Sequence, residues 1–350
     1  MERGLAAVPT QTVVRNFPAP APPTATNAVT PEPLRRAPEP SRLQAPPKLA
    51  SSPGTSAVQL EKEHFPRPVQ DWLEAQVALA RLAISPGSID GLVGPQTRAA
   101  LRAFQHAHSL TPSGELDAAT RAALVLDTPV YTHAVVSADD LSRLQPVSPS
   151  WLGKSRQPAL EYESLLELLA EKSQAHPSLI RRLNPATDWT RVSPETRIVV
   201  PCVNRSVPSE KAAFVRIRLA ERSLQAFGSQ SNLLAHFPCS IARMVEKRPL
   251  GELRVVVVIS NPNYTFDPEL FPESPEARSL SNKLVIPPGP NNPVGVAWIG
   301  LDRPGYGIHG TPSPEQVGRT ESHGCFRLAN WNAALLVELA WVGMPVYVEP

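Results

Sequence analysis

The sequence of 350 residues has few cysteines, few aromatic residues and almost no net charge. Its three cysteines are too few for a disulfide scaffold, and their odd number leaves at least one unpaired within the chain. Lys and Arg number 34 against 32 Asp and Glu, without a basic block, so we expect no nucleic-acid partner. Strongly apolar runs reach only five residues, as at Val255–Ile259, whereas a membrane helix needs about 18. We therefore expect no transmembrane segment in this chain.

Proline, in contrast, is abundant, and 14 of the 41 prolines lie in residues 1–70. That segment is otherwise made of Ala, Thr, Ser and scattered charge, and it has too few large apolar residues to offset the entropy of ordering. We interpret residues 1–70 as a disordered or extended linker, which its prolines make semi-stiff. The first residues contain no apolar core of a secretory signal, so by themselves they indicate a cytosolic protein.

Residues 71–127 predict a small unit of three helices, with Pro95 in the first turn of the second helix and Asp117 capping the third. The strings that carry this unit are Asp90-Gly91-x-x-Gly94-Pro95-x-Thr97, Ala100-Leu101-x-x-Phe104-Gln105 and Gly114-x-Leu116-Asp117-x-x-Thr120. In order and spacing they resemble the peptidoglycan-binding domain of bacterial cell-wall enzymes. The resemblance implies glycan strands as a partner, but these residues are structural and do not locate a ligand groove.

Residues 128–204 predict an amphipathic helix over 162–173, a short helix after Pro177 that stops at Asn184-Pro185, and a strand over 197–201. This order is similar to the back part of a LysM module, another glycan-binding unit, although its opening strand is not recognisable. The alternative is a helical connector that packs on its neighbour.

In residues 213–350 apolar and polar residues alternate with a period of two, which predicts a mostly-β domain. A long surface excursion is expected over 261–293, and one helix over about 332–342. The expected strands cover residues 214–219, 224–227, 254–259 (a buried strand), 294–301 and 345–348. The fold class is therefore multidomain: an all-α three-helix module, an α+β connector and a mostly-β C-terminal domain.

Two histidines and one cysteine fall within seventeen residues, in Ile308-His309-Gly310-Thr311 and in the segment from Glu321 to Asn330. A cysteine becomes nucleophilic as its thiolate, and an adjacent imidazole lowers the pKa of the thiol and accepts its proton. Spacing alone does not choose between His309 and His323 as the partner of Cys325. Gly324 lets backbone N–H groups converge, as an oxyanion hole requires.

The strings His-Gly-Thr and Ser-His-Gly-Cys-x-Arg-Leu-x-Asn resemble the catalytic signature of the L,D-transpeptidases, which have the β-rich YkuD-type fold. Two upstream segments, Arg248-Pro249-Leu250-Gly251 and Asn292-Pro293-Val294-Gly295, are similar to further motifs of that family. Arg248 stands where the family has Thr, which puts nothing catalytic in doubt. The resemblance covers residues 214–349.

On the matched positions, the resemblance implies that Cys325 is the acylated nucleophile, that His309 takes its proton and that the Gly310 carbonyl orients the imidazole. His323 would shape the pocket, and the Gly324 and Cys325 amides would face the oxyanion. The remaining polar residues of the signature form an expected substrate-binding set: Arg327, Ser322, Thr311 and Asn330. The alternative role for Arg327 is an ion pair within the domain. The hydroxyls of Ser322 and Thr311 are expected to be structural rather than to react.

The implied reaction is acyl transfer on peptidoglycan. Cys325 attacks the carbonyl between diaminopimelate and a terminal D-alanine, D-alanine leaves, and an amine of a neighbouring stem peptide takes the acyl group to form a 3-3 cross-link. If water takes the amine's place, the same site is an L,D-carboxypeptidase or a wall hydrolase. Two further alternatives are a non-catalytic wall-binding scaffold and a zinc site formed by His309, His323 and Cys325. We expect neither a metal nor another cofactor.

Peptidoglycan lies outside the inner membrane, so the implied function predicts a periplasmic or wall-associated protein and conflicts with the first residues. Our hypothesis is that the given N-terminus is incomplete, trimmed or wrongly started. In an oxidising envelope Cys202 and Cys239 could pair, but two buried thiols are the preferred interpretation. The sequence does not indicate an oligomeric state.

Overall fold

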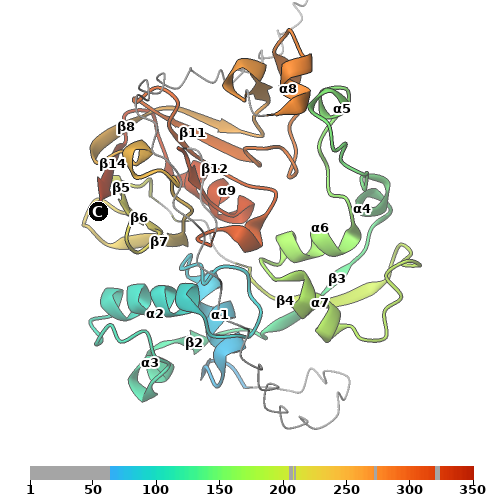
Figure 1. Ribbon diagram of the computed structural model, residues 1–350. Coiled ribbons are helices and arrows are strands. Elements are labelled where there is room, and N and C mark those ends of the chain that lie inside the picture. The colour runs from blue at the N-terminus through green and yellow to red at the C-terminus, as the bar shows by residue number, and fades with distance from the viewer. Residues whose placement is uncertain (1–63, 205–207, 209, 272–273, 320–323) are drawn as a thin grey trace, which may run out of the picture.

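The computed structural model describes residues 64–204, 208, 210–271, 274–319 and 324–350. They form a helical module, a middle module and a C-terminal domain (Figure 1). Most of residues 1–70, the predicted linker, lies outside the described residues. Its end, at Arg67–Pro68, is instead part of the helical module. Strand β1 (Arg67–Pro68) pairs antiparallel with β2 (Val125–Leu126) and joins the two ends of the helical module. The boundary at residue 70 is therefore several residues too late.

The helical module confirms the three predicted helices, α1 (Trp72–Arg81), α2 (Pro95–Ala107) and α3 (Ala118–Ala123). Two buried glutamines hold its turns. The Gln76 Nε2 donates to Asp90 Oδ1 at 3.0 Å, and the Gln105 Oε1 accepts from Gly114 N at 2.8 Å. Because a buried amide is costly without partners, these bonds tie each glutamine to a turn residue of the motif.

The middle module contains the predicted α6 (Leu165–Lys172), α7 (Pro177–Leu183) and β4 (Arg197–Pro201). Helix α6 starts three residues later than predicted, where the Ser164 side chain accepts a hydrogen bond from Glu167 N. The unrecognised opening strand is β3 (Tyr131–Val135), antiparallel to β4. It buries none of its residues and so lacks the alternation that predicts a strand. The sequence also did not predict α4 (Ala138–Ser142) and α5 (Trp151–Ser155), helices of five residues each.

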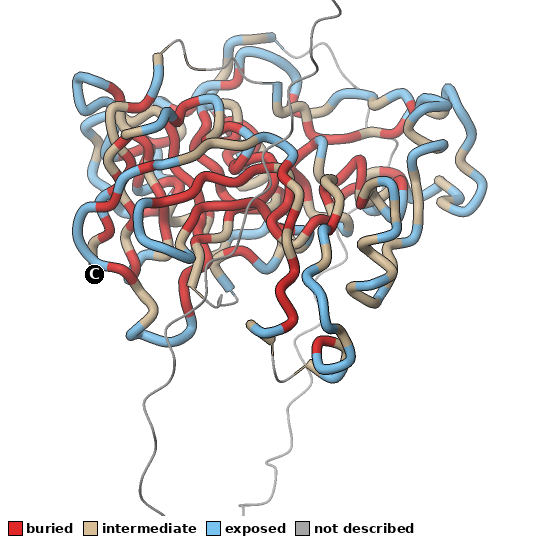
Figure 2. The backbone as a smooth tube through the Cα atoms, turned by 90° about the horizontal axis from the view of Figure 1, so that it is seen from above, coloured by how far each residue is buried: buried red, intermediate tan, exposed pale blue. Residues whose placement is uncertain are grey.

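The C-terminal domain is built on an eight-stranded sheet of order β13-β12-β11-β8-β14-β5-β6-β7. The pairs β12–β13 and β14–β5 are parallel and the others antiparallel. The strands are β5 (Phe214–Arg218), β6 (Ser223–Phe227), β7 (Leu233–Pro238), β8 (Gly251–Ser260), β11 (Ala297–Leu301), β12 (Gly307–His309), β13 (Phe326–Arg327) and β14 (Pro345–Glu349). Helix α9 (Asn330–Leu339) packs on the curled sheet (Figure 1), and apolar residues of both form a buried core, which is red in Figure 2.

The curl of the sheet brings its two outer strands together. The segment that follows β7 meets β13, where Ser240 N donates to Arg327 O at 2.9 Å and Arg327 N donates to Ser240 O at 3.0 Å. The sheet is thus nearly closed on itself at Arg327, which places the end of β7 beside the motif-bearing strands.

The mostly-β prediction is confirmed, but the excursion over 261–293 is more than a surface loop. It contains β9 (Tyr264–Phe266), the turn η2 (Pro268–Leu270), α8 (Pro275–Ser279) and β10 (Leu284–Ile286). Trp151 of α5 stacks on Phe266 with ring centroids 4.2 Å apart, so the middle module covers this excursion. Three-residue strands are too short to show a period, and α8 makes the expectation of a single helix wrong.

Two further predictions need correction. The strand expected to be buried over 254–259 is the longer β8, which has buried and exposed positions, with Val256 51% exposed. Strand β7 was not predicted at all. None of the helices among the described residues is long and apolar enough to span a membrane.

Candidate active site

His309 and Cys325 belong to two neighbouring parallel strands, one at the end of β12 and the other directly before β13. His309 ends β12, and the register pairs Ile308 with Phe326 and His309 with Arg327. Cys325 directly precedes β13, and its Sγ lies 3.5 Å from the Gly305 carbonyl oxygen. The described residues therefore place the thiol next to the histidine strand, although sixteen residues separate the two in sequence.

The His309 ring is held in one tautomer. It is 5% exposed and stacks on Trp298 with centroids 5.7 Å apart. Its Nδ1 lies 2.6 Å from the Gly310 carbonyl oxygen, which can only accept a hydrogen bond. In the neutral ring Nδ1 therefore carries the hydrogen, and Nε2 keeps the lone pair that can accept a proton. This contact is the orientation that the Gly310 carbonyl was expected to provide.

Burial decides the protonation of both groups at rest. Burial lowers the pKa of His309 to about 4. The Arg327 cation also lowers this pKa, whereas the hydrogen bond to Gly310 raises it. Burial raises the pKa of the Cys325 thiol to about 11, opposed by a backbone hydrogen bond from Gly307 and by the Arg327 cation. Near pH 7 the described pair is therefore a neutral thiol and a neutral imidazole.

Asn330 fixes the turn that follows His309. Its Oδ1 accepts from Thr311 N at 3.1 Å and from Val296 N at 3.3 Å, and its Nδ2 donates to Pro290 O at 3.1 Å. A Cβ on Gly310 would lie 2.2 Å from Asn330 Oδ1, so this position requires glycine. Asn330 is 1% exposed, and its amide is occupied by protein groups rather than turned toward a cavity.

Glu171 of α6 extends this arrangement into the middle module. Asn330 Nδ2 donates to Glu171 Oε1 and Oε2 at 3.1 and 3.2 Å, and the Tyr162 hydroxyl donates to Oε1 at 3.2 Å. Burial raises the pKa of Glu171 to about 7, although both of these hydrogen bonds lower it. Sequence reasoning missed Glu171, because nothing in the sequence connects a helical glutamate to a residue 159 positions away.

A cavity of about 460 Å³ adjoins the site and is lined by Ser240, Thr311, Gln316 and Arg327, among others. Burial lowers the pKa of Arg327, and no carboxylate of the described residues forms an ion pair with it. The cavity thus presents a cation that lies two residues after Cys325 in the chain. Gly324 precedes Cys325, and a Cβ there would lie 4.0 Å from the Tyr306 ring. Ser322 and His323 lie outside the described residues.

The two other cysteines are both free thiols. Cys239 is fully buried in the core of the sheet, whereas Cys202 is half-buried, so the preferred interpretation of two buried thiols is right for one of them. Within the described ranges, His, Cys, Asp and Glu form no group of three that could hold a metal ion. The zinc alternative needs His323, however, and is not tested by that finding.

Comparison with protein families gives two matches. Residues 212–348 match the family described as "L,D-transpeptidase catalytic domain", and residues 68–124 match "Putative peptidoglycan binding domain". The first match covers His309, Cys325 and Asn330. The second covers the three predicted helices.

Curated relatives carry the same designation. The chain is 24% identical over 185 residues to "Putative L,D-transpeptidase YkuD" of Bacillus licheniformis, which covers 53% of this chain and 93% of that protein. It is 34% identical over 105 residues to "Putative L,D-transpeptidase YqjB" of Bacillus subtilis, covering 29% of this chain and about half (51%) of that protein.

Among solved structures, an L,D-transpeptidase from Xylanimonas cellulosilytica (residues 123–326) aligns at 15% identity and a TM-score of 0.33, covering 81% of this chain and 94% of that one. An L,D-transpeptidase from Mycobacterium smegmatis aligns at 18% identity and a TM-score of 0.31, over 45% of this chain and 64% of that one. Residues 212–348 are thus similar to L,D-transpeptidase catalytic domains, and residues 68–124 are similar to peptidoglycan-binding domains.

Proposed function

We propose that this protein is a peptidoglycan L,D-transpeptidase that works through an acyl-enzyme on Cys325. The observation that carries the proposal is the fixed His309 tautomer, with Nδ1 bonded to the Gly310 carbonyl and Nε2 left to accept a proton, on the strand beside the one that Cys325 precedes. A neutral base next to a neutral thiol suits a proton transfer that accompanies the attack.

The proposed reaction has two acyl transfers. Cys325 Sγ bonds to the carbonyl carbon between diaminopimelate and D-alanine while His309 Nε2 takes the thiol proton. The tetrahedral intermediate then expels D-alanine as the C–N bond breaks, and the proton returns to the leaving amine. In the second step an amine of a neighbouring stem peptide attacks the thioester, the C–S bond breaks, and Cys325 recovers its proton. The product is a 3-3 cross-link.

The other expected site residues have supporting roles in this proposal. The Gly324 and Cys325 amides stabilise the oxyanion, and Arg327 in the 460 Å³ cavity meets a substrate carboxylate. Thr311 lines the same cavity, whereas Asn330 acts as a positioning residue because its amide is occupied by the turn after His309. His323 is proposed to shape the pocket, and Ser322 to serve as a structural hydroxyl.

The proposed partners are the stem peptides and glycan strands of peptidoglycan. The match of residues 68–124 to a peptidoglycan-binding family supports this choice. Because this substrate is extracytoplasmic, we propose a wall-associated or periplasmic location.

The test is intact-protein mass spectrometry of the full chain after incubation with a tetrapeptide donor. The proposal predicts a mass gain equal to the donor minus D-alanine, carried by Cys325 and absent in Cys325→Ala. An added amine acceptor should remove the adduct and yield a cross-linked peptide. Release of free tripeptide whether or not the acceptor is present would instead show a carboxypeptidase.

Two outcomes would overturn the proposal. Wall remodelling that survives Cys325→Ala would support a non-catalytic scaffold. Activity lost on chelation but retained after thiol alkylation would support the zinc alternative.

A further inference from the structure

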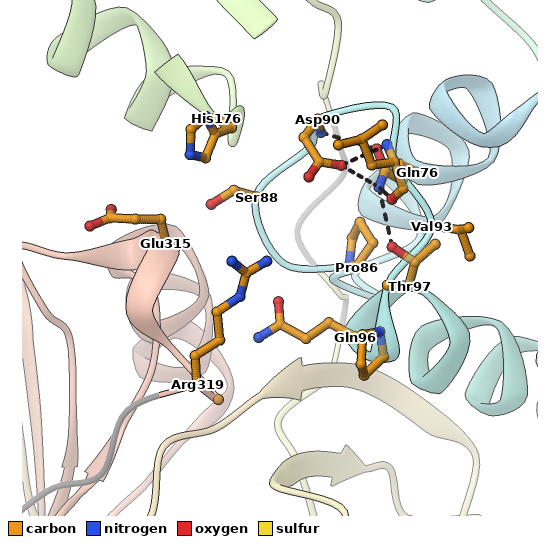
Figure 3. A pocket seen from close by; sticks show the side chains of 14 residues that line it. Gln76, Pro86, Ser88, Asp90, Val93, Gln96, Thr97, His176, Glu315 and Arg319 are labelled. Carbon is orange, nitrogen blue, oxygen red and sulfur yellow. Dashed lines mark hydrogen bonds between the residues drawn. The ribbon is translucent and has the colours of Figure 1, made fainter. Parts of the chain in front are cut away.

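A second cavity, of about 310 Å³, lies where the three parts of the chain meet (Figure 3). The helical module contributes the loop over residues 86–97, the middle module contributes His176, and the catalytic domain contributes Glu315, Gly318 and Arg319. We call this the three-module cavity. Its volume is within the range of cavities that bind small molecules.

Hydrogen bonds between the parts hold the walls of the three-module cavity in place. Ile89 N donates to Gln174 O and His176 N donates to Ile89 O, both at 2.8 Å, which fixes the loop to the middle module. Ser85 N donates to His236 O at 2.8 Å, and Asn332 Nδ2 donates to Ser85 Oγ at 3.0 Å, which fixes it to the catalytic domain. The cavity is therefore preformed, and no single module contains it.

Gln96 forms the tightest part of this junction. Its Nε2 donates to the Val317 carbonyl oxygen, and its side chain occupies space that a Cβ on Gly87 or Gly318 would fill. Both glycines have a positive φ, +88° and +73°. The turn η3 (Pro314–Gln316) and the residues after it are thus joined to the helical module. The three-module cavity lies beside this junction.

Two charged side chains at this cavity form no ion pair among the described residues. Glu315 and Arg319 both line it, yet they form no ion pair with each other or with another residue in the described part of the chain. The Ser88 hydroxyl likewise has no hydrogen-bond partner among those residues, and Figure 3 shows Ser88, His176 and Arg319 directed toward one space. Asp90, in contrast, bonds to Gln76 and belongs to the wall. A ligand carboxylate would fit between Ser88 and Arg319 as they stand, whereas the Glu315 carboxylate is turned away from that space in Figure 3 and would reach a ligand ammonium by rotation of its side chain.

The turn η3 separates this cavity from the 460 Å³ cavity. Gln316 and Val317 line the 460 Å³ cavity with Thr311 and Arg327, whereas Glu315, Gly318 and Arg319 line the three-module cavity. Both cavities adjoin the segment that connects His309 to Cys325. A ligand in the three-module cavity would therefore lie next to, but outside, the reacting groups.

We propose that the three-module cavity is a second binding site, for a free amino-acid centre that carries an ammonium and a carboxylate on one carbon. Arg319 and Ser88 bind the carboxylate, and Glu315 binds the ammonium. Resting on the proposed function, we assign the occupant as the unreacted diaminopimelate end of a stem peptide, which docks the enzyme on the wall. An amine held by Glu315 is protonated and distant from the thioester, so this stem is a docking stem and not the acceptor.

The test is calorimetric titration of the full-length Cys325→Ala variant with meso-diaminopimelate, because this variant cannot be acylated and so separates binding from catalysis. We expect saturable binding with a dissociation constant below about 10 mM. Pimelate, which lacks the ammonium groups, and 1,5-diaminopentane, which lacks the carboxylates, should each bind at least about tenfold more weakly. If pimelate binds as tightly as meso-diaminopimelate, the cavity does not recognise the ammonium and the proposal is overturned.

Matched variants locate the binding. Arg319→Gln and Glu315→Gln, each in the Cys325→Ala background, should weaken binding about tenfold or more, whereas the exposed charges Arg278→Gln and Glu246→Gln should leave it unchanged. Thermal melts of the four variants check that they fold. Absence of saturable binding, or binding that both cavity variants leave intact, would overturn this proposal. Either result would leave the acylation test of Cys325 untouched, so the two proposals fail separately.

Discussion

The catalytic domain carries two histidine–cysteine pairs at opposite ends of its strand order, and only one of them is arranged for chemistry. His309 and Cys325 belong to β12 and the start of β13, whereas His236 lies on β7 and Cys239 follows that strand. The Ser240–Arg327 bridge brings the two regions together. Burial lowers the pKa of both histidines to about 4, so residue type and burial do not separate the pairs.

Hydrogen bonding and access separate them. His309 donates from Nδ1 to a carbonyl and keeps Nε2 as an acceptor. His236 Nδ1 lies 3.3 Å from Gln225 Nε2, an amide donor, so its lone pair is occupied. Cys239 is fully buried and its Sγ donates to Ser240 O at 3.4 Å, whereas Cys325 is half-buried. The same two residue types thus serve packing in one region and proton transfer in the other.

The largest expected difference between the pairs is in the cysteines. Cys325→Ala should abolish the donor-dependent mass gain, because no other described thiol lies beside His309. Cys239→Ala should retain acylation and lower the free energy of unfolding by about 1–2 kcal/mol, through the small cavity it leaves in the core. Mass spectrometry and urea denaturation measure the two effects. Acylation lost equally in both variants would remove the distinction.

The histidines should differ next. His309→Gln should slow acylation about 10²- to 10⁴-fold, because the general base is lost. His236→Gln removes a buried ring that no proposed step uses, so its acylation rate should stay within about threefold of the wild type, with a lower melting temperature. Stopped-time mass spectrometry at saturating donor compares the rates. A comparable loss of acylation rate in both variants would show that the rate does not depend on the tautomer of His309.

Glu171 sharpens the comparison, because this ionisable group of the middle module hydrogen-bonds to Asn330 at the turn after His309. Its pKa is about 7 in the folded protein against 4.5 unfolded, so the folded state binds more protons between these values. Stability is therefore full below about pH 4.5 and falls as the pH rises through 7, by no more than about 3 kcal/mol. Glu171→Gln should remove that part of the pH dependence.

The measurement is urea denaturation at several pH values between 5 and 9, with Glu167→Gln as the matched control on the same helix. A wild type and a Glu171→Gln variant that lose stability in parallel as the pH rises would contradict the assignment.

The smallest expected effect is in thiol reactivity. Because the pKa of Cys325 is about 11, its alkylation by iodoacetamide should rise roughly tenfold per pH unit from 7 to 9 without a plateau. Cys239 should stay unmodified in the folded protein, since burial raises the pKa of its thiol and excludes the reagent. Peptide mapping after timed alkylation gives both rates. A plateau near pH 7 for Cys325 would instead indicate a preformed thiolate.

The sequence alone indicated the catalytic signature and most of the helices, because these signals are local. Asp117 and Pro95 mark helix starts within one turn, and the spacing around His309 and Cys325 is a property of two short strings. It did not indicate β3, whose residues are too exposed to alternate, or β9 and β10, whose three residues show no period.

What the sequence determined by itself is which residues are available for chemistry and in which module each lies. Only the tertiary structure decided that His309 faces its own Gly310 carbonyl, that Glu171 reaches Asn330 and that Glu315, Arg319 and Ser88 line one cavity. Tautomer, burial and pKa depend on which groups surround an atom. Those groups come from chain segments tens to hundreds of residues away, so only the folded chain brings them together.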